Sequence, residues 1–260
     1  METYLQLARE AARLAGDRIL EALEGGRTEV RYKGPRDPVT VVDEACQEII
    51  RQHLVGACPG FGFWGEEGGA RSRGEEWCWI VDPIDVTRNF SRGYPMVAVS
   101  IALQRAGQVV LGVVHDPIRR EVFSAVRGQG AFRNHQRLEV SPTSQLGEAL
   151  LVTGFAAGLE IEHALFSRFE RASQGVRRDG CASLNLCYVA CGRLDACWHL
   201  GLSPWDVAAG ALLVEEAGGM VTDCAGRPFT LEGRQLVASN VRLHRQLVEV
   251  TRDSISAESC

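Results

Sequence analysis

The amino-terminal part of the chain carries hydrophobic residues at helical spacing. Apolar side chains recur every three or four positions and then stop at the pair Gly25-Gly26, a typical helix end. The residues of this stripe are Ala8, Ala12, Ala15, Ile19 and Leu23. After a loop over Gly34–Pro38, the pattern predicts a second helix that begins near Asp43 and directs Ala45, Ile49 and Leu54 inward.

The middle of the chain has the pattern of strands. Residues 75–82 end in an apolar, aromatic run and predict a buried strand. Residues 96–117 and 121–132 alternate between apolar and polar positions, are rich in β-branched residues and contain glycine-bearing turns. This pattern predicts an antiparallel meander.

The pattern changes after residues 141–144, where helices and strands are predicted to alternate. The predicted elements are a strand at 149–155, a helix from about 163, a helix at 183–192, a strand at 193–200 and a helix at 205–219. We therefore expect one domain over residues 1–260. Its antiparallel-rich N-terminal half (about 1–140) and its α/β C-terminal half (about 141–250) should meet in a cleft, and the polar tail at 252–260 should be loose.

Composition narrows the possible partners and the compartment. The chain has 260 residues, of which 45% are hydrophobic, and its formal net charge is −5 without a basic stripe. Nucleic acid and membrane surfaces are therefore not expected as partners. No run reaches the 18 or so apolar residues of a membrane span, and the first ten residues lack the order of a secretory signal, so a cytoplasmic location is expected.

Nine cysteines, an odd number, favour reduced thiols over a disulfide framework. One cluster, Cys187, Cys191, Cys197 and His199, leaves a structural zinc site open as an alternative. The cluster contains no C-x-x-C pair, and two of its cysteines share helical spacing with Leu184 and Tyr188. That spacing favours packing in a helix, where cysteine behaves as a small hydrophobe.

The predicted strand at 75–82 leads directly into two carboxylates, Asp82 and Asp85, separated by Pro83 and Ile84. Carboxylates held this close repel each other unless a cation lies between them. Hard oxygen ligands on a stiff turn suit Mg²⁺, which shares its coordination shell with phosphate and water. The alternative is structural, with Asp82 ending a strand and Asp85 capping a helix.

Two further acidic stretches bear on this choice. Glu66-Glu67 lie between aromatic residues and glycines, in what we expect to be an exposed loop. Asp206 lies in the first turn of a predicted helix with Ser203 as N-cap and Pro204 at the first position. Taken alone, Asp206 is therefore also explained as a capping-box acid.

In this order, the stretches G-E-E (65–67), D-P-I-D-x-T-x-N-F (82–90), P-W-D-x-A-A-G (204–210) and E-A-G-G (216–219) resemble the inositol monophosphatase family. Its members are Mg²⁺-dependent, typically Li⁺-inhibited phosphatases that include fructose-1,6-bisphosphatases, and the resemblance runs from about Lys33 to about Asn240. It implies the layered αβαβα sandwich of the sugar phosphatases and a homodimer.

The resemblance also implies the metal ligands. One Mg²⁺ would be bound by Glu66, Asp82 and the carbonyl of Ile84, and a second by Asp82, Asp85 and Asp206. A third, weaker ion would depend on Glu66 through water, giving two to three ions for each active site.

The catalytic roles implied by the resemblance fall on residues that flank these ligands. Asp43 would pair with the hydroxyl of Thr87 to orient and deprotonate the attacking water, assisted by Glu66. Phosphate oxygens would meet the N–H groups of Val86 and Thr87 at the start of a helix, without a covalent phosphoenzyme.

The chain departs from the family pattern at Val86, where the family has glycine. If this position requires a positive φ or close approach of phosphate, valine introduces strain and crowds the ligand. If only the N–H group matters, valine still donates it.

A second departure is His199, at a position where inositol-specific members carry a glutamate that binds ring hydroxyls. An imidazole can bind a hydroxyl, or a second anionic group if it is protonated. The resemblance places Gly180, Cys181 and Ala182 along the alcohol pocket, with Asp85 and Asp206 also reaching the substrate.

The sequence thus predicts a Mg²⁺-dependent, lithium-sensitive phosphomonoesterase acting on inositol monophosphate or a related polyol or sugar phosphate. Histidinol phosphate, fructose 1,6-bisphosphate and adenosine 3′,5′-bisphosphate remain open as substrates. From a different functional class, Val86 leaves open a catalytically impaired protein that binds phosphate and acts through a partner.

Overall fold

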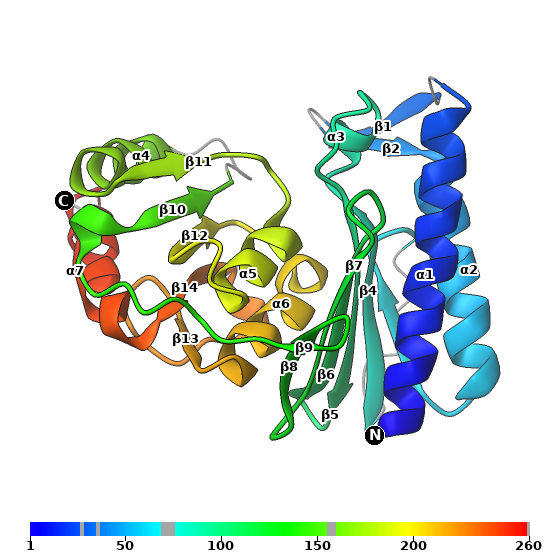
Figure 1. Ribbon diagram of the computed structural model, residues 1–260. Helices are drawn as coiled ribbons and strands as arrows, with labels where there is room; N and C mark the ends of the chain where they lie inside the picture. Colours follow the sequence, from blue (N-terminus) through cyan, green and yellow to red (C-terminus); the bar gives the residue numbers. More distant parts are fainter. Residues whose placement is uncertain (27–28, 35–36, 69–75, 155–159, 259–260) are drawn as a thin grey trace.

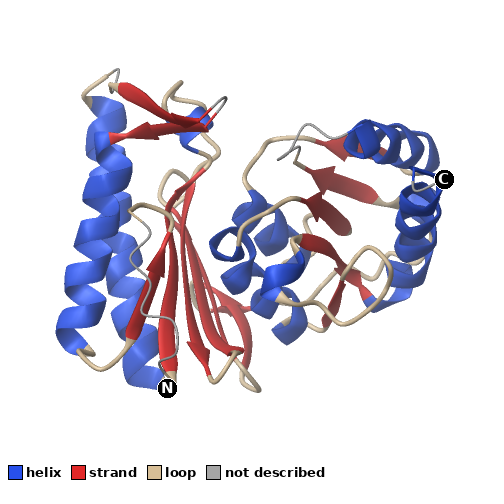
Figure 2. Cartoon of the chain, turned by 180° about the vertical axis from the view of Figure 1, so that it is seen from behind, coloured by secondary structure: helices blue, strands red, loops and turns tan. Residues whose placement is uncertain are grey.

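The computed structural model describes residues 1–26, 29–34, 37–68, 76–154 and 160–258, which form five stacked layers (Figures 1 and 2). Two helices cover one face of a seven-stranded sheet, two central helices separate that sheet from a five-stranded sheet, and two further helices cover the outer face. The expected αβαβα sandwich is therefore confirmed.

The N-terminal half is built on the sheet order β3-β4-β5-β6-β7-β8-β9, antiparallel throughout except for the parallel pair β3–β4. Its strands are β3 (Gly62–Gly65), β4 (Trp77–Asp85), β5 (Ala98–Arg105), β6 (Gln108–Asp116), β7 (Glu121–Val126), β8 (Gly130–Arg133) and β9 (Gln136–Arg137). The predicted meander corresponds to β5–β8. Its outer face is covered by α1 (Glu2–Glu24) and α2 (Val41–Ala57).

The helical stripe of α1 is buried as predicted, because its small alanines let the helix lie close to the sheet and to α2. In α2 the predicted inward face is wrong at two of its three positions. Leu54 is fully buried as predicted, but Ala45 and Ile49 are only half buried, and Cys46 and Ile50 are fully buried in their place. The buried stripe keeps a four-residue spacing from Val42 to Leu54, which the sequence pattern did not single out.

Two segments near the site differ from the sequence prediction. The expected loop over Gly34–Pro38 overlaps a short antiparallel pair, β1 (Val30–Gly34) and β2 (Asp37–Thr40), and residues 35–36 of that loop lie outside the described residues. The Glu66-Glu67 segment directly follows β3, and Glu67 is only 8% exposed, so the prediction of an exposed loop was wrong. Parallel pairing of β3 with β4 holds this segment beside Val81, whose carbonyl accepts from the N–H of Glu66 at 3.2 Å.

The C-terminal half has the strand order β11-β10-β12-β14-β13. Its strands are β10 (Leu150–Thr153), β11 (Gly175–Arg177), β12 (Ala196–Leu200), β13 (Gly219–Thr222) and β14 (Gln235–Asn240), with the short helices η1 (Leu146–Glu148) and η2 (Leu231–Gly233) nearby. The central helices are α5 (Ala182–Ala190) and α6 (Pro204–Glu216), and the outer ones are α4 (Glu160–Ala172) and α7 (Val241–Glu258). The tail expected to be loose is part of α7 up to Glu258.

One hydrophobic core joins the two halves. Side chains of the first sheet such as Ile80, Val114 and Phe123 share it with Leu184 of α5 and Leu213 of α6. Cys187 and Cys197 are buried in the same core, and among the described residues no group of histidine, cysteine and acidic side chains is arranged to hold a metal. The packing interpretation of these cysteines is therefore favoured over the zinc site.

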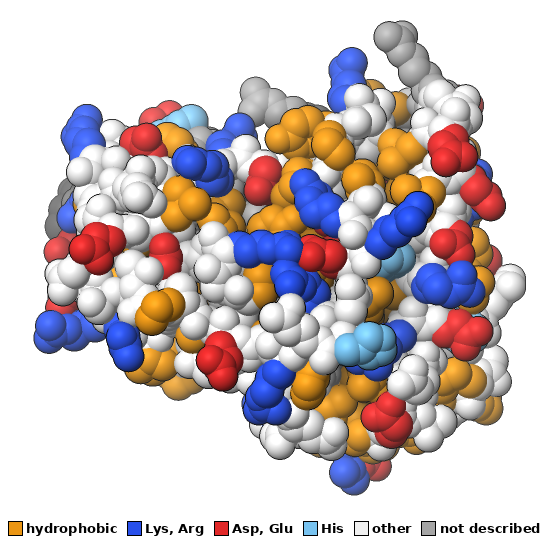
Figure 3. All heavy atoms as spheres, viewed as in Figure 1, with side chains coloured by type: hydrophobic (Ala, Val, Ile, Leu, Met, Phe, Trp, Pro, Cys, Tyr) orange, Lys and Arg blue, Asp and Glu red, His pale blue; other side chains and the backbone are white. Residues whose placement is uncertain are grey.

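The outer surface carries acidic and basic side chains interspersed with apolar ones on the face shown in Figure 3. Within the described part of the chain, no helix is both long enough and apolar enough to cross a membrane.

Candidate active site

The two carboxylates of the D-P-I-D segment lie at the end of β4, where pairing with β5 becomes irregular. The register shifts between Asp82 and Asp85, and Pro83 lies within this break. Asp82 is 1% exposed and accepts a hydrogen bond from the N–H of Ile84 at 3.1 Å. The shift directs both carboxylates toward one pocket of about 470 Å³.

Asp85 connects the two halves of the molecule. Its Oδ2 accepts hydrogen bonds from the backbone N–H of Ser183 at 2.7 Å, from the Ser183 hydroxyl at 2.6 Å and from the thiol of Cys181 at 3.3 Å. Burial raises the pKa of Asp85 to about 6, although the Ser183 hydrogen bonds favour its ionised form. A residue of α5 thus fixes a carboxylate delivered by β4.

Asp206 occupies the third position of α6, as the sequence predicted, and its Oδ2 accepts from the N–H of Ser203 at 2.8 Å. The same carboxyl lines the pocket with Asp82 and Asp85. Burial and the neighbouring acids raise the pKa values of Asp82 and Asp206 well above the usual range for aspartate. Asp206 therefore both caps α6 and lines the pocket.

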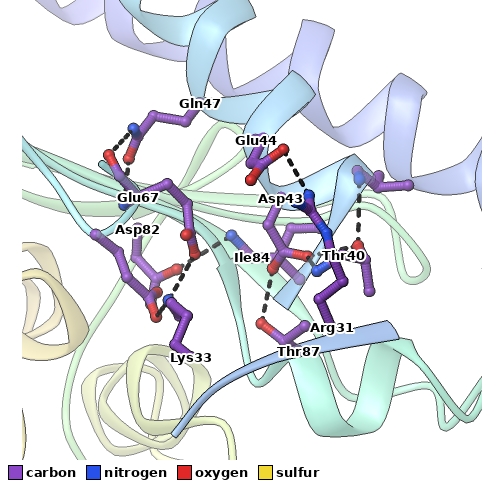
Figure 4. A network of polar contacts seen from close by, with 12 residues as sticks. Arg31, Lys33, Thr40, Asp43, Glu44, Gln47, Glu67, Asp82, Ile84 and Thr87 are labelled. Atoms are coloured by element: carbon purple, nitrogen blue, oxygen red, sulfur yellow. Dashed lines mark hydrogen bonds and ion pairs between the residues drawn. The ribbon is translucent and has the colours of Figure 1, made fainter. Parts of the chain in front are cut away.

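Lys33 is the cation that pairs with the Glu66-Glu67 segment. Its Nζ lies 2.8 Å from Oε1 of Glu66 and 2.8 Å from Oε1 of Glu67 (Figure 4). Burial disfavours the charged ammonium, but hydrogen bonds to both glutamates outweigh this effect and raise the pKa of Lys33. Glu67 is anchored in turn by Gln47, whose Oε1 accepts from its N–H at 2.8 Å.

Asp43 and Thr87 form the pair that the sequence predicted. The hydroxyl of Thr87 donates to Asp43 Oδ1 at 2.7 Å, and the other oxygen accepts from the N–H of Thr40 at 2.8 Å and its hydroxyl at 2.5 Å (Figure 4). Burial raises the pKa of Asp43 despite these donors. A fixed carboxylate with a raised pKa that holds a hydroxyl at the pocket wall suits a general base.

Val86 has left-handed backbone geometry, with φ 71° and ψ 64°, immediately before α3 (Thr87–Phe90). A β-branched residue is strained there, since its Cβ crowds the neighbouring carbonyl, at a cost of about 1–2 kcal/mol. Among the described residues, the N–H groups of Val86 and Thr87 donate no hydrogen bond, and both residues line the pocket. Because α3 is only one turn long, it has no appreciable macrodipole. An anion in the pocket would therefore be bound by these N–H groups themselves.

The other end of the pocket is lined by Gly180, Ala182 and His199, as expected, and also by Gly154. Cys181 directs its thiol to Asp85 and is not among the lining residues. A larger groove of about 1070 Å³ lies beside the site, between Leu23, Tyr32 and Phe90, but carries none of the acids.

The donor chemistry of the acidic end fits divalent metal. Glu66, Asp82, Asp85 and Asp206 all line one pocket, and burial of like charges raises the pKa of all three aspartates. The geometry is not preassembled, since no three acidic, histidine or cysteine side chains in the described segments already surround a metal-sized space. Lys33 holds Glu66, so metal binding would require this ion pair to open, whereas the Ser203 N–H holds only one of the two oxygens of Asp206.

Sequence reasoning missed several residues that position the site, namely Lys33, Gln47, Gly154 and Ser183. Lys33, Gly154 and Ser183 act across long sequence separations, so no local pattern marks them. Thr40 was detectable in principle, because Thr40 and Asp43 have the T-x-x-D spacing of a capping box.

Comparison with known proteins gives concordant matches over nearly the whole chain. Residues 1–256 match the model of the inositol monophosphatase family. "Nus factor SuhB" of Pseudomonas aeruginosa is 43% identical over 95% of each chain, and "Inositol monophosphatase 2" of Solanum lycopersicum is 40% identical over 98% of this chain and 100% of its own. The solved structure of the extragenic suppressor protein suhB from Bartonella henselae superposes with a TM-score of 0.92 at 37% identity, covering 96% of this chain and 98% of that one.

Proposed function

Because the chain belongs to the inositol monophosphatase family and is a phosphoric monoester hydrolase, we propose that it hydrolyses inositol monophosphate or a related polyol phosphate with the help of Mg²⁺. The observation that carries this proposal is the convergence on one pocket of buried acids from β4 and α6 and the Asp43–Thr87 pair. Chance placement of so many buried acids at one site would destabilise the fold without benefit.

Members of this family are generally metal-dependent, and we propose that the acidic side chains of the pocket are the metal ligands. Glu66, Asp82 and the carbonyl of Ile84 would hold one Mg²⁺, and Asp82, Asp85 and Asp206 a second, with a third, weaker one near Glu66. When bound, the ions neutralise phosphoryl charge and make water a better nucleophile. Lithium inhibition would follow from competition for one of these positions.

The remaining chemistry belongs to the protein. Asp43 orients the Thr87 hydroxyl at 2.7 Å, so together they hold and deprotonate the attacking water. The N–H groups of Val86 and Thr87 would donate to the phosphate oxygens and so orient the phosphorus atom for in-line attack by water. No covalent intermediate is required.

The two halves of the chain are joined by hydrogen bonds at the pocket. The bonds from Ser183 to Asp85 tie the two halves at the site, so we propose that residues 1–260 act as one domain. We also propose that the protein is a homodimer and that it is located in the cytoplasm.

The test is phosphate release from inositol 1-phosphate, histidinol phosphate, fructose 1,6-bisphosphate and adenosine 3′,5′-bisphosphate, with Mg²⁺ or with EDTA. We expect Mg²⁺-dependent release that is greatest with inositol 1-phosphate. Asp82→Asn should lose it, whereas the surface variant Asp17→Asn should keep it, since Asp17 is exposed, lies outside the pocket and forms an ion pair with exposed Arg13. Release that is equal in EDTA and Mg²⁺ would refute the metal-dependent mechanism.

Val86 supports a second candidate. A strained valine beside the phosphate position is consistent with a protein that binds phosphate but turns it over poorly and acts through a partner, and some relatives carry the name "Nus factor". Absence of phosphate release from every ester in Mg²⁺, together with saturable binding of inorganic phosphate, would favour this candidate.

A further inference from the structure

Val86 places a branched side chain at the turn that would receive the phosphate. Its backbone has φ 71°, a conformation that glycine adopts freely and valine adopts only with strain. Strain of this kind persists only where the surrounding structure holds it, and it clusters at functional sites. The isopropyl group is attached to the carbon next to the N–H group that would donate to phosphate, and Val86 lines the pocket. A bound phosphate would therefore bring its ester oxygen and the first carbon of the alcohol near this side chain.

The isopropyl group of Val86 faces Gly180 in the other half of the molecule. A Cβ added at Gly180 would lie 3.4 Å from Cγ1 of Val86 and 3.9 Å from its Cγ2, which is ordinary van der Waals contact. Both residues line the pocket, and Gly180 lies in the segment between β11 and α5, on the side that faces the N-terminal half (Figure 1). Val86 and Gly180 therefore form a narrow point of the pocket, which we call the waist.

The waist lies between the acids and the alcohol end of the pocket. On one side, Asp85 directly precedes Val86 in the sequence. On the other side, a Cβ added at Gly154 would lie 4.0 Å from the carbonyl of Gly180 and 3.5 Å from the ring of His199. An alcohol that extends from the acids to the alcohol end is therefore bordered by the waist.

Hydrogen bonds between the two halves brace the waist on both sides. Asn89 of α3 donates from Nδ2 to the carbonyl of Asp179 at 2.9 Å. Ser183 of α5 donates to Asp85 from its N–H at 2.7 Å and from its hydroxyl at 2.6 Å. Because these four residues flank the waist in the sequence, its two walls cannot separate unless these bonds break.

A fixed waist distinguishes alcohols by their branching. In the ester of a primary alcohol, the carbon bonded to the ester oxygen carries one further carbon, whereas in the ester of a secondary alcohol, such as a ring polyol, it carries two. A rigid apolar wall beside that carbon hinders the second substituent. In a close-fitting pocket, one extra carbon changes kcat/KM by roughly 10-fold or more.

We propose that Val86 is a specificity-determining residue whose side chain narrows the waist, so that phosphate esters of secondary alcohols are slowed more than those of primary alcohols. The proposal rests on the proposed phosphatase function and specifies how the site distinguishes leaving alcohols. Glycine at the same position would leave the waist open.

The kinetic test compares glycerol 2-phosphate, a secondary ester, with its primary isomer glycerol 3-phosphate, which has the same atoms and the same charge. Val86→Gly should raise the ratio of kcat/KM for the secondary ester to that for the primary ester by roughly 5- to 10-fold, because only the secondary ester has a second carbon beside the waist. Val86→Thr keeps the branched shape and nearly the same volume, so it should leave the ratio at the wild-type value.

Val86→Ala separates the bulk of the side chain from the strain of the backbone. Alanine at φ 71° keeps the Cβ atom and its strain but lacks the two methyl groups, so it should raise the ratio nearly as much as glycine does. The matched control is Ala106→Gly, because Ala106 also has a positive φ, 47°, but is exposed in the turn between β5 and β6, outside the pocket. It should leave the ratio unchanged. A ratio that rises in Val86→Gly alone would assign the effect to the backbone and overturn the proposal.

Binding measurements separate this proposal from the function on which it rests. Hydrolysis of both esters with the same ratio in wild type, Val86→Gly and Val86→Ala would reject the waist and retain the phosphatase function. If neither ester is hydrolysed, isothermal titration calorimetry in Mg²⁺ buffer gives the same comparison. A relative gain in affinity of Val86→Gly for glycerol 2-phosphate would then retain the waist and reject the phosphatase function, whereas no gain would reject both.

Discussion

The two ends of the active-site pocket are built on opposite electrostatic principles. At the acidic end, Asp82, Asp85 and Asp206 are buried together, and burial raises the pKa of each, with a further contribution from the neighbouring acids. At the alcohol end, burial lowers the pKa of His199 to about 4, and the niche behind the ring is lined by apolar side chains together with Arg234 and Gln235. Burial disfavours the charged form in both places, but only the acidic end contains several groups whose charges a cation could neutralise.

The difference indicates how the pocket divides its tasks. Like charges held close together store an unfavourable energy that bound metal relieves, so the acidic end is suited to chemistry. A neutral ring whose nitrogens have no hydrogen-bond partner among the described residues gains most from a neutral hydroxyl, so the alcohol end is suited to choosing the substrate. Four predictions test this division.

The largest effect is expected from Asp85→Asn at the acidic end. Turnover of inositol 1-phosphate should fall roughly 10²- to 10³-fold, because the proposed metal site loses a ligand charge while the amide oxygen still accepts from Ser183. In metal-free buffer at pH 7 the variant should be more stable than wild type, by roughly 1–3 kcal/mol, since one repelling carboxylate is gone. Steady-state kinetics and urea unfolding measure both quantities. Unchanged turnover would show that Asp85 is not a metal ligand.

Thr87→Ala should lower kcat about 10²-fold, because the attacking water loses one of the two groups that orient it. Asp43 also loses a hydrogen bond that favours its ionised form, so the acidic limb of the pH–rate profile should move to higher pH. Thr87→Ser retains the hydroxyl and should stay within about 10-fold of wild type in kcat. Equal kinetics of the alanine and serine variants would exclude the hydroxyl from catalysis.

The pH dependence of stability should differ with and without metal. In the folded protein the three aspartates have raised pKa values, about 6 for Asp85 against 3.8 ordinarily, so the folded state binds more protons than the unfolded state above about pH 4. Stability in EDTA should therefore fall as pH rises from about 4 through 6 and beyond, and Mg²⁺ should reverse much of this loss. Melting temperatures measured in EDTA and in Mg²⁺ isolate the acidic end, because the histidines contribute equally to both series. Parallel curves would contradict the metal assignment.

The smallest effect is expected from Val86→Gly. Glycine accepts φ 71° without strain, which should raise kcat/KM a few-fold by letting the N–H groups approach phosphate. The free energy of unfolding should change by less than about 1 kcal/mol, because relief of strain is offset by the greater freedom of the unfolded chain and by lost packing of the valine side chain against the core. Lower activity of the glycine variant would mean that the valine side chain itself shapes the substrate position.

Many features of the acidic end could be predicted from the sequence. The spacing of Asp82 and Asp85 after an apolar run, and the Ser203–Asp206 cap, are local patterns, and each side chain lies where its pattern places it. The strand β4 follows from a continuous apolar run, and the meander after it follows from alternation within a few residues. The exposed loop predicted at Glu66-Glu67 was wrong, because burial there depends on Gln47 and Lys33, which are distant in sequence.

By itself, the sequence predicted α1, α2, the strands β4 to β8, the alternation of β10, α4, α5, β12 and α6, and the candidate site residues, because periodicity, caps and acidic motifs act within one or two turns of chain. It did not predict the strands β1, β2, β3, β13 and β14 or the helix α7. The tertiary structure alone decided the left-handed geometry of Val86, the Ser183 bonds to Asp85, and the isolation of His199 beside Gly154. Each of these features depends on which segments of the two halves pack together. That packing is set by the summed free energies of contacts between residues far apart in the sequence, which a short stretch of sequence does not reveal. The choice between a hydroxyl and a second anion was open in the sequence for that reason, since the charge of an imidazole is set by its surroundings.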